Sequence, residues 1–272
     1  MIPRDYISQW RLEAPWVTDE QVEQDLVISR AVAEIFSVPQ LADRLAWRGG
    51  TAIFKLFLRP AARYSEDIDL VQTTAEPIGE TFDLLRSVLD PWLGEPRRVL
   101  KQGRVNLVYR YTSEGTPPQV MKLKIEINSR EHFTEFGHIS VGFGVDSRWW
   151  SAKAQVTTFE LDELLATKLR ALYQRKKGRD LFDLWYALNH AAVEPTRVVG
   201  CFDRYMRESG PGVSRAVFEE NLIRKLKDPV FRSDMGPLLR SGINWDVDRA
   251  GEVVLREFVS RLPSGGLRTT KI

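Results

Sequence analysis

One segment, residues 49–70, constrains the fold and the chemistry of this chain more than any other. It opens with Gly-Gly-Thr, continues with an apolar run of helical length at residues 52–58, and ends in Ser-Glu-Asp-Ile-Asp-Leu. Asp67 and Asp69 alternate with apolar residues, which predicts a strand, and residues two apart on a strand point to the same face. Two adjacent carboxylates repel each other unless a cation lies between them, and Mg²⁺ prefers oxygen ligands of this kind. The pair is therefore a candidate magnesium site.

The glycine pair predicts a tight turn that opens a helix. Glycine lets the backbone approach an anion closely, and the first N–H groups of a helix have no acceptor within it. Gly49, Gly50 and Thr51 are therefore candidate phosphate ligands, and Ser65 adds a hydroxyl directly before the acidic pair. Taken singly, an Asp-x-Asp is usually a solvated strand end and a Gly-Gly is usually a turn. The two motifs together favour nucleotidyl transfer without settling the choice.

The composition is that of a globular protein with a substantial core. The chain has 272 residues, of which 43% are hydrophobic and 28% charged, enough for one large domain or two modest ones. A net charge of +2 permits an RNA partner but does not argue for one. The single cysteine, Cys201, excludes an intramolecular disulfide, and one cysteine with three histidines argues against a zinc site. With no signal segment and no run of membrane-spanning length, we expect a soluble, cytoplasmic protein without a membrane partner.

The hydrophobic period in the first half of the chain predicts mixed secondary structure. Thr18 and Gln21 fit a capping box that opens a helix, and residues 79–93 carry a second helical pattern. Residues 105–111 alternate between apolar and polar, and residues 120–127 return in the same manner. This pattern predicts a β-hairpin whose second strand carries Glu126 on its polar face.

From residue 161 onward the pattern is helical throughout. We expect helices at residues 161–176, 179–192, 195–208, 213–227 and 247–261. The expected fold class is therefore α+β and bilobed. A mixed α/β lobe covers residues 1–158, an all-helical lobe covers residues 159–262, and residues 263–272 form a disordered tail. A cleft between the two lobes is the expected place for a site.

A second group of charged residues lies on the first two of these helices. Lys168 lies in or beside a stripe of leucines, where a lysine is more often a snorkelling surface residue than a catalytic one. Asp180 and Asp183 are three residues apart on one face of the next helix. Asp180 fits a charge that favours a helix N-terminus. Asp183 lies among apolar residues and needs a partner, for which Lys168 is the candidate, although such a pair can be purely structural.

Together these motifs resemble the AbiEii-type nucleotidyltransferase toxins of type IV toxin–antitoxin systems, within the DNA polymerase β-like nucleotidyltransferase superfamily. Four motifs in the order expected for that family match residues 49–51 with 65–69, residues 124–127, residues 168–172 and residues 179–183. The resemblance covers about residues 20–190. It implies a bilobed fold and the transfer of a nucleoside monophosphate from an NTP to RNA, with pyrophosphate released and the 3′ acceptor end of tRNA as the acceptor. It also implies inhibited growth and a separately encoded antitoxin.

The resemblance implies a role for each site residue. Asp67 and Asp69 would hold Mg²⁺, with Glu126 as a third ligand or as the base that activates an RNA hydroxyl. Lys168 would neutralise the triphosphate of the NTP, and Asp183 would orient that lysine or contact the nucleotide. The glycine pair, Thr51 and Ser65 would hold phosphates, and Ser65 matches a position that can be phosphorylated in some relatives.

Two basic clusters are candidates for binding the acceptor RNA. The first comprises Arg97, Arg98, Lys101 and Arg104, and the second comprises Arg175, Lys176, Lys177 and Arg179. Either cluster can equally be a solvated face. Three other readings stay open: a nucleotidyltransferase that modifies a small molecule such as an antibiotic, a protein-modifying or kinase-like enzyme, and a binding protein without catalysis.

Overall fold

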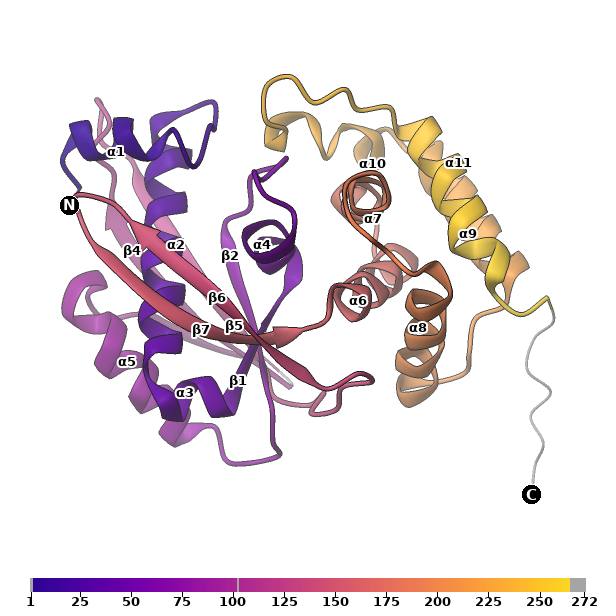
Figure 1. Cartoon of the computed structure of the whole chain (residues 1–272), viewed down its shortest axis with the longest axis horizontal. Helices are drawn as coiled ribbons and strands as arrows, with labels where there is room; N and C mark the ends of the chain where they lie inside the picture. Colours follow the sequence, from indigo (N-terminus) through magenta and orange to yellow (C-terminus); the bar gives the residue numbers. More distant parts are fainter. Residues whose placement is uncertain (1, 102, 265–272) are drawn as a thin grey trace. The chain divides into compact units, whose positions relative to one another are not determined.

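The chain folds into two compact units, which a computed structural model describes over residues 2–101 and 103–264 (Figure 1). The first unit runs to Phe159 and includes Arg240–Gly242, and the second comprises Glu160–Leu239 and the chain from Ile243. The expected α+β class is confirmed, because a mixed sheet with helices is followed by helices. Most of the expected disordered tail, residues 265–272, lies outside the described residues.

A seven-stranded mixed sheet forms the centre of the first unit, in the order β3-β4-β5-β2-β1-β7-β6. Its strands are β1 (Leu45–Arg48), β2 (Asp67–Gln72), β3 (Arg97–Lys101), β4 (Arg104–Thr112), β5 (Val120–Asn128), β6 (His138–Asp146) and β7 (Ser151–Phe159). The expected hairpin is confirmed as β4 and β5, which pair antiparallel. β2 then joins this hairpin by pairing parallel with β5, which places the acidic motif near the middle of the sheet.

Helix α2 (Asp19–Ser37) is buried along almost its whole length. The capping box of Thr18 and Gln21 is present at its start. The buried residues of α2 include polar ones such as Asp25 and Ser29 beside its apolar side chains, and the helix packs against β5, β7 and the neighbouring helices (Figure 1). The other helices of this unit are α1 (Arg4–Trp10), α3 (Pro39–Arg44), α4 (Gly49–Ala52), the π-helical segment η1 (Ile53–Phe57) and α5 (Gly79–Leu93). One face of the sheet is thus covered, and its alternating apolar side chains are buried there.

The second unit consists of helices in the part of the chain that the structure describes. They are α6 (Leu161–Gln174), α7 (Gly178–His190), α8 (Pro195–Ser209), α9 (Arg215–Leu226), α10 (Pro229–Ser233), η2 (Gly236–Leu238), α11 (Val247–Glu257) and η3 (Val259–Arg261). Helix α6 packs against α7 and α8, and its leucine stripe is buried. Among the described residues of the whole chain, we find no helix with the length and apolar character needed to cross a membrane.

Lys225 closes the C-terminal end of α6. Its ammonium donates hydrogen bonds to the carbonyl oxygens of Leu172 and Tyr173, the second at 2.8 Å. The last carbonyls of a helix have no partner within it, so a cation is favoured there. Burial lowers the pKa of Lys225 to about 8, against the attraction of Asp180.

Candidate active site

Three carboxylates lie on one face of the sheet, on neighbouring strands. In the parallel pairing of β2 with β5, Asp69 stands opposite Glu126 and Asp67 stands opposite Lys124. Partners in register point to the same side of a sheet, so Asp67, Asp69 and Glu126 share a face. This face, named here the carboxylate face, is opposite the one that buries Ile68 and Leu70. It remains accessible, since the Asp67 side chain is 41% exposed.

Two basic side chains lie among these carboxylates. The Lys124 ammonium is 3.0 Å from Glu126 Oε2 and 3.6 Å from Asp67 Oδ2, and a guanidinium nitrogen of Arg104 is 3.0 Å from Glu126 Oε1. Burial would raise the pKa of Glu126, but Lys124 and Arg104 outweigh that effect and hold it below its usual value. Asp67 is less well compensated: burial together with Asp69 and other nearby carboxylates raises its pKa to about 6, although Lys124 opposes the shift.

The glycine turn lies directly against Asp69. Gly49 has a φ of +85°, and a Cβ added there would lie 2.2 Å from Asp69 Oδ2. A Cβ added to Gly50 would lie 2.0 Å from the Arg63 guanidinium. Both positions therefore require glycine, the first for its backbone conformation as well as for space. The turn opens α4, whose N-terminus has no side-chain cap, so its N–H groups remain available to an anion.

Thr51 and Ser65 tie this turn to the start of β2. The Thr51 hydroxyl lies 2.7 Å from the Asp67 carbonyl oxygen and 2.7 Å from the Ser65 hydroxyl. Because a carbonyl only accepts, the Thr51 hydroxyl donates to it and accepts from Ser65. Sequence analysis assigned both hydroxyls to phosphate; in the structure they bond to each other and to the start of β2, and so hold the turn in place.

The donor set fits Mg²⁺. Carboxylate oxygens of Asp67 and Asp69 provide the one or two protein ligands that Mg²⁺ commonly takes alongside substrate phosphates. Within the described ranges, no group of three or more His, Cys, Asp or Glu side chains converges closely enough to hold a metal ion by itself. Lys124 instead lies between Asp67 and Glu126. These residues therefore suit a cation whose remaining ligands come from the phosphates of the substrate.

A separate ion cluster lies inside the helical unit. The Lys168 ammonium is 2.8 Å from Asp183 Oδ2 and 3.3 Å from Asp180 Oδ1, and all three side chains are buried. Arg175 contacts both carboxylate oxygens of Asp180, at 2.7 and 2.9 Å. Burial would raise the pKa of Asp180, but Lys168 and Arg175 hold it below its usual value.

The expected pairing of Lys168 with Asp183 is confirmed. The interpretation of Lys168 as a snorkelling surface residue is wrong, since it is buried. Asp180 does lie in the first turn of α7, but it is fully buried and shares Lys168, so it is more than a helix-end charge. Local sequence carried no signal for this, because it cannot show which surface a helix turn faces.

The two basic clusters differ from expectation. Every member of the second pairs with an acid within its own unit: Arg175 with Asp180, Lys176 with Asp228, and both Lys177 and Arg179 with Asp234. These pairs leave little unbalanced positive charge. In the first cluster, register places Arg97 and Arg104 on the carboxylate face, whereas Arg98 lies over the Phe82 ring on the other face. The side chain of Lys101 lies outside the described part of the structure.

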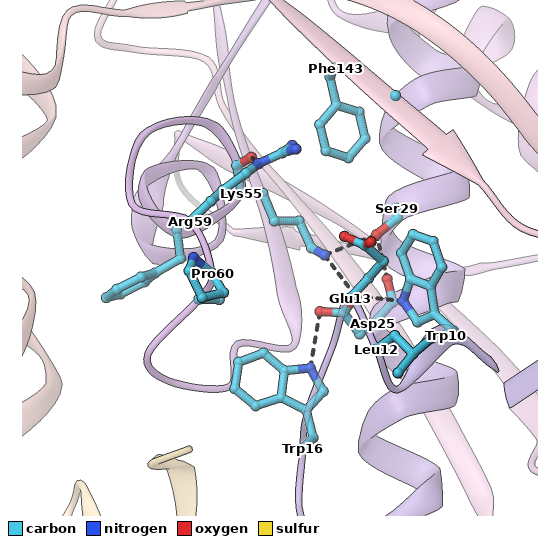
Figure 2. Close-up of a pocket in the computed structure, with 13 residues that line it drawn as sticks. Trp10, Leu12, Glu13, Trp16, Asp25, Ser29, Lys55, Arg59, Pro60 and Phe143 are labelled. Carbon is cyan, nitrogen blue, oxygen red and sulfur yellow. Dashed lines mark hydrogen bonds and ion pairs between the residues drawn. The ribbon is translucent and has the colours of Figure 1, made fainter. Parts of the chain in front are cut away.

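A cavity of about 330 Å³ in the first unit is separate from these residues (Figure 2). Trp10, Trp16 and Lys55 all donate to the buried Asp25 carboxylate at its floor, at 2.9, 3.1 and 2.8 Å. Figure 2 shows these side chains converging from the N-terminal segment, α2 and η1. The two tryptophan hydrogen bonds fix the N-terminal segment to α2. Lys55 compensates the charge of the buried Asp25. Sequence analysis did not identify Asp25 or Lys55.

Comparison with known proteins finds one matching family model and several solved structures with a similar fold. The family model described as "Nucleotidyl transferase AbiEii toxin, Type IV TA system" matches residues 30–253. Among solved structures, MenT4, a nucleotidyltransferase toxin from Mycobacterium tuberculosis H37Rv, is similar with a TM-score of 0.69 and 16% identity, over 97% of this chain and 91% of that one. A putative nucleotidyltransferase from H. pylori is similar with a TM-score of 0.54 and 15% identity, over 89% and 94%. No curated protein sequence matches the chain.

Proposed function

The chain belongs to the AbiEii family of nucleotidyltransferase toxins of type IV toxin–antitoxin systems, and from this we propose that it transfers a nucleoside monophosphate from an NTP to RNA, at the 3′ acceptor end of tRNA. The observation that carries the proposal is the carboxylate face beside an uncapped glycine turn. A cation-binding pair and a row of N–H donors are what a triphosphate with its Mg²⁺ requires.

In this proposal each residue of the first unit has one task. Asp67 and Asp69 hold Mg²⁺, which when bound supplies positive charge to the reacting phosphate. Glu126, in register with Asp69, orients the attacking RNA hydroxyl or accepts its proton. The N–H groups of the turn at Gly49 and Gly50 hold phosphate oxygens.

We assign Lys168 and Asp183 to the catalytic residues on the basis of the family motifs. Lys168 then neutralises charge on the triphosphate, and Asp183 holds the lysine in its charged form through their 2.8 Å contact. Because the pair is buried, the test needs a substitution of both residues that keeps the fold, as described in the Discussion.

For the acceptor, the exposed arginines of the carboxylate face are better candidates than the paired second cluster. Arg97 and Arg110 are exposed, and register places both on that face. A protein that contacts RNA phosphates through such side chains binds less tightly as salt concentration rises. A cognate antitoxin is the protein partner that the family implies.

The direct experiment incubates the protein with each [α-³²P]NTP and with total tRNA, purified small acceptors and cell protein in parallel. The proposal expects label on the 3′ end of tRNA, in a Mg²⁺-dependent manner, with one or two NTPs preferred. Label on an aminoglycoside or another small molecule would move the function to the small-molecule alternative. Label on protein would move it to the protein-modifying one, and no label on any acceptor would contradict nucleotidyl transfer itself.

A further inference from the structure

A lysine stands at the centre of the carboxylate face. Lys124 stands opposite Asp67 in the pairing of β2 with β5, two residues before Glu126 on the same side of the strand. Its ammonium is 3.0 Å from Glu126 Oε2 and 3.6 Å from Asp67 Oδ2. A cation therefore already lies between carboxylates that come from two different strands.

We propose that Lys124 is a built-in counter-ion, which occupies the cation position of this site in the metal-free protein and leaves it when a divalent metal binds. The inference rests on the proposed function, because it takes Asp67 as a metal ligand. It adds a residue that none of the family motifs used above assigns. Lys124 acts through the carboxylates and is a positioning residue.

A divalent cation is expected to displace the Lys124 ammonium because the two charges repel each other and the lysine side chain is long and flexible. An ammonium and a divalent cation about 4 Å apart repel each other by several kcal/mol even at an intermediate dielectric constant, so they do not share the Asp67 carboxylate. The Lys124 side chain is one-third exposed, and its flexible four-carbon stem lets the ammonium move without moving β5. Arg104 remains on Glu126 after Lys124 has left, so that carboxylate keeps a partner.

Displacement also couples metal binding to nucleotide binding. With metal alone, the released ammonium loses two carboxylates and gains only water, so metal binds weakly. When a triphosphate is present, its oxygens offer the ammonium a new anionic partner, so metal and nucleotide each strengthen the binding of the other. The site then stays empty of metal until its substrate arrives.

The test measures Mn²⁺ binding by the full chain as the loss of the free Mn²⁺ signal in electron paramagnetic resonance, with and without a nucleoside 5′-(α,β-methylene)triphosphate. Each sample is compared with a protein-free sample of the same composition, which accounts for the Mn²⁺ that the nucleotide binds by itself. Without nucleotide, Lys124→Met is expected to bind Mn²⁺ about tenfold more tightly than wild type, since the competing charge is gone. Lys124→Arg keeps the charge and is expected to bind like wild type. Lys122→Met is the matched control, because Lys122 lies one step along the same face, opposite Arg110. With the nucleotide analogue, the gain in Mn²⁺ affinity is expected to be larger for wild type than for Lys124→Met.

The outcomes separate this inference from the proposed function. Equal or weaker Mn²⁺ binding by Lys124→Met, while wild type binds and Asp69→Asn does not, overturns the counter-ion role and leaves the metal site standing. Wild type that binds no Mn²⁺ even with the analogue overturns both. If Lys124→Met does not fold, Lys124→Gln replaces it, and tenfold tighter binding by that variant supports the inference while unchanged binding overturns it.

Discussion

The carboxylate face and the Lys168 cluster both combine acids with bases, yet they balance charge differently. On the carboxylate face, Asp67, Asp69 and Glu126 stand against the cations of Lys124 and Arg104, and the side chains are partly exposed. In the helical unit, Asp180 and Asp183 stand against Lys168 and Arg175, and both aspartates are fully buried. Among the residues named, the carboxylates of the first group outnumber its bases by one, whereas the second group has two of each.

This difference indicates what each group can do. A matched, buried cluster is expensive to break, because removing one partner leaves an uncompensated charge. Partly exposed ion pairs add little stability. Burial, together with the neighbouring carboxylates, raises the pKa of Asp67 to about 6. Carboxylates that stabilise the fold little are better placed to bind a cation than to hold the fold. The following substitutions break or sharpen this contrast.

The largest expected effect is the loss of transfer activity when a carboxylate of the carboxylate face is removed. Asp67→Asn keeps the shape of the side chain and deletes a metal ligand, so we expect labelled-NTP transfer to fall by about 1,000-fold or more. Stability should be unchanged or slightly higher, because a repulsion is lost. A melting temperature several degrees lower, with proportionate loss of activity, would instead mean that Asp67 is structural.

In the buried cluster, Lys168→Met removes the cation that the two buried aspartates share. We expect the free energy of unfolding to fall by about 3–5 kcal/mol, measured by urea denaturation. The double variant Lys168→Met with Asp183→Leu removes the orphaned charge and should recover part of that stability. If the double variant is stable and inactive, Lys168 is catalytic; full activity in it would show that the pair only holds the fold.

Glu23 supplies a third case, a buried carboxylate whose pKa is raised by burial more than the N-terminal ammonium lowers it. Its Oε2 accepts the N–H of Glu114 at 3.0 Å, whereas its Oε1 has no hydrogen-bond partner among the described residues. Burial raises the pKa of Glu23 to about 7. The folded state therefore holds a proton that the unfolded state has released, and this contribution to stability is present below pH 4.5 and lost as the pH rises through 7.

Between pH 5 and pH 8, wild type is expected to lose about 2–3 kcal/mol of unfolding free energy relative to Glu23→Gln. Urea titrations of both proteins at each pH measure the difference. A constant difference across this range would show that Glu23 is ionised in the fold.

The smallest expected effect concerns the glycine turn. Gly49→Ala forces a Cβ toward the Asp69 carboxylate and onto a positive φ, so we expect a loss of about 1–3 kcal/mol together with reduced transfer. Gly94→Ala is the matched control, because Gly94 also has a positive φ, of 77°, but a Cβ there meets nothing within 4 Å. Equal effects of the two substitutions on transfer would remove any special role of the turn at Gly49.

Sequence analysis succeeded where the signal lies among residues that are close together in the chain. Alternation predicted the β4–β5 hairpin, the capping box predicted the start of α2, and a buried acid predicted the Lys168–Asp183 pair. Glu126 was placed with Asp67 and Asp69 by the family resemblance and not by local spacing. The position of Lys124 beside Asp67 follows from a parallel pairing of distant strands that no local spacing encodes.

Ion pairs between distant helices were missed for the same reason. Asp228 and Asp234 neutralise Lys176 and Lys177 from a segment about fifty residues further along the chain. Counting positive charges along residues 175–179 therefore overstated the field that this cluster presents. The burial of Asp180 likewise depends on which neighbours cover the start of α7.

The most direct measurement is single-turnover transfer of [α-³²P]NTP label to tRNA by wild type and by Asp69→Asn at several Mg²⁺ concentrations. The melting temperatures of both proteins are measured to show that the variant is folded. Metal-dependent transfer by wild type and at least a 1,000-fold lower rate for a normally folded Asp69→Asn is the expected result. Transfer by Asp69→Asn at the wild-type rate and with the same Mg²⁺ dependence would contradict the assignment of the carboxylate face as the catalytic centre.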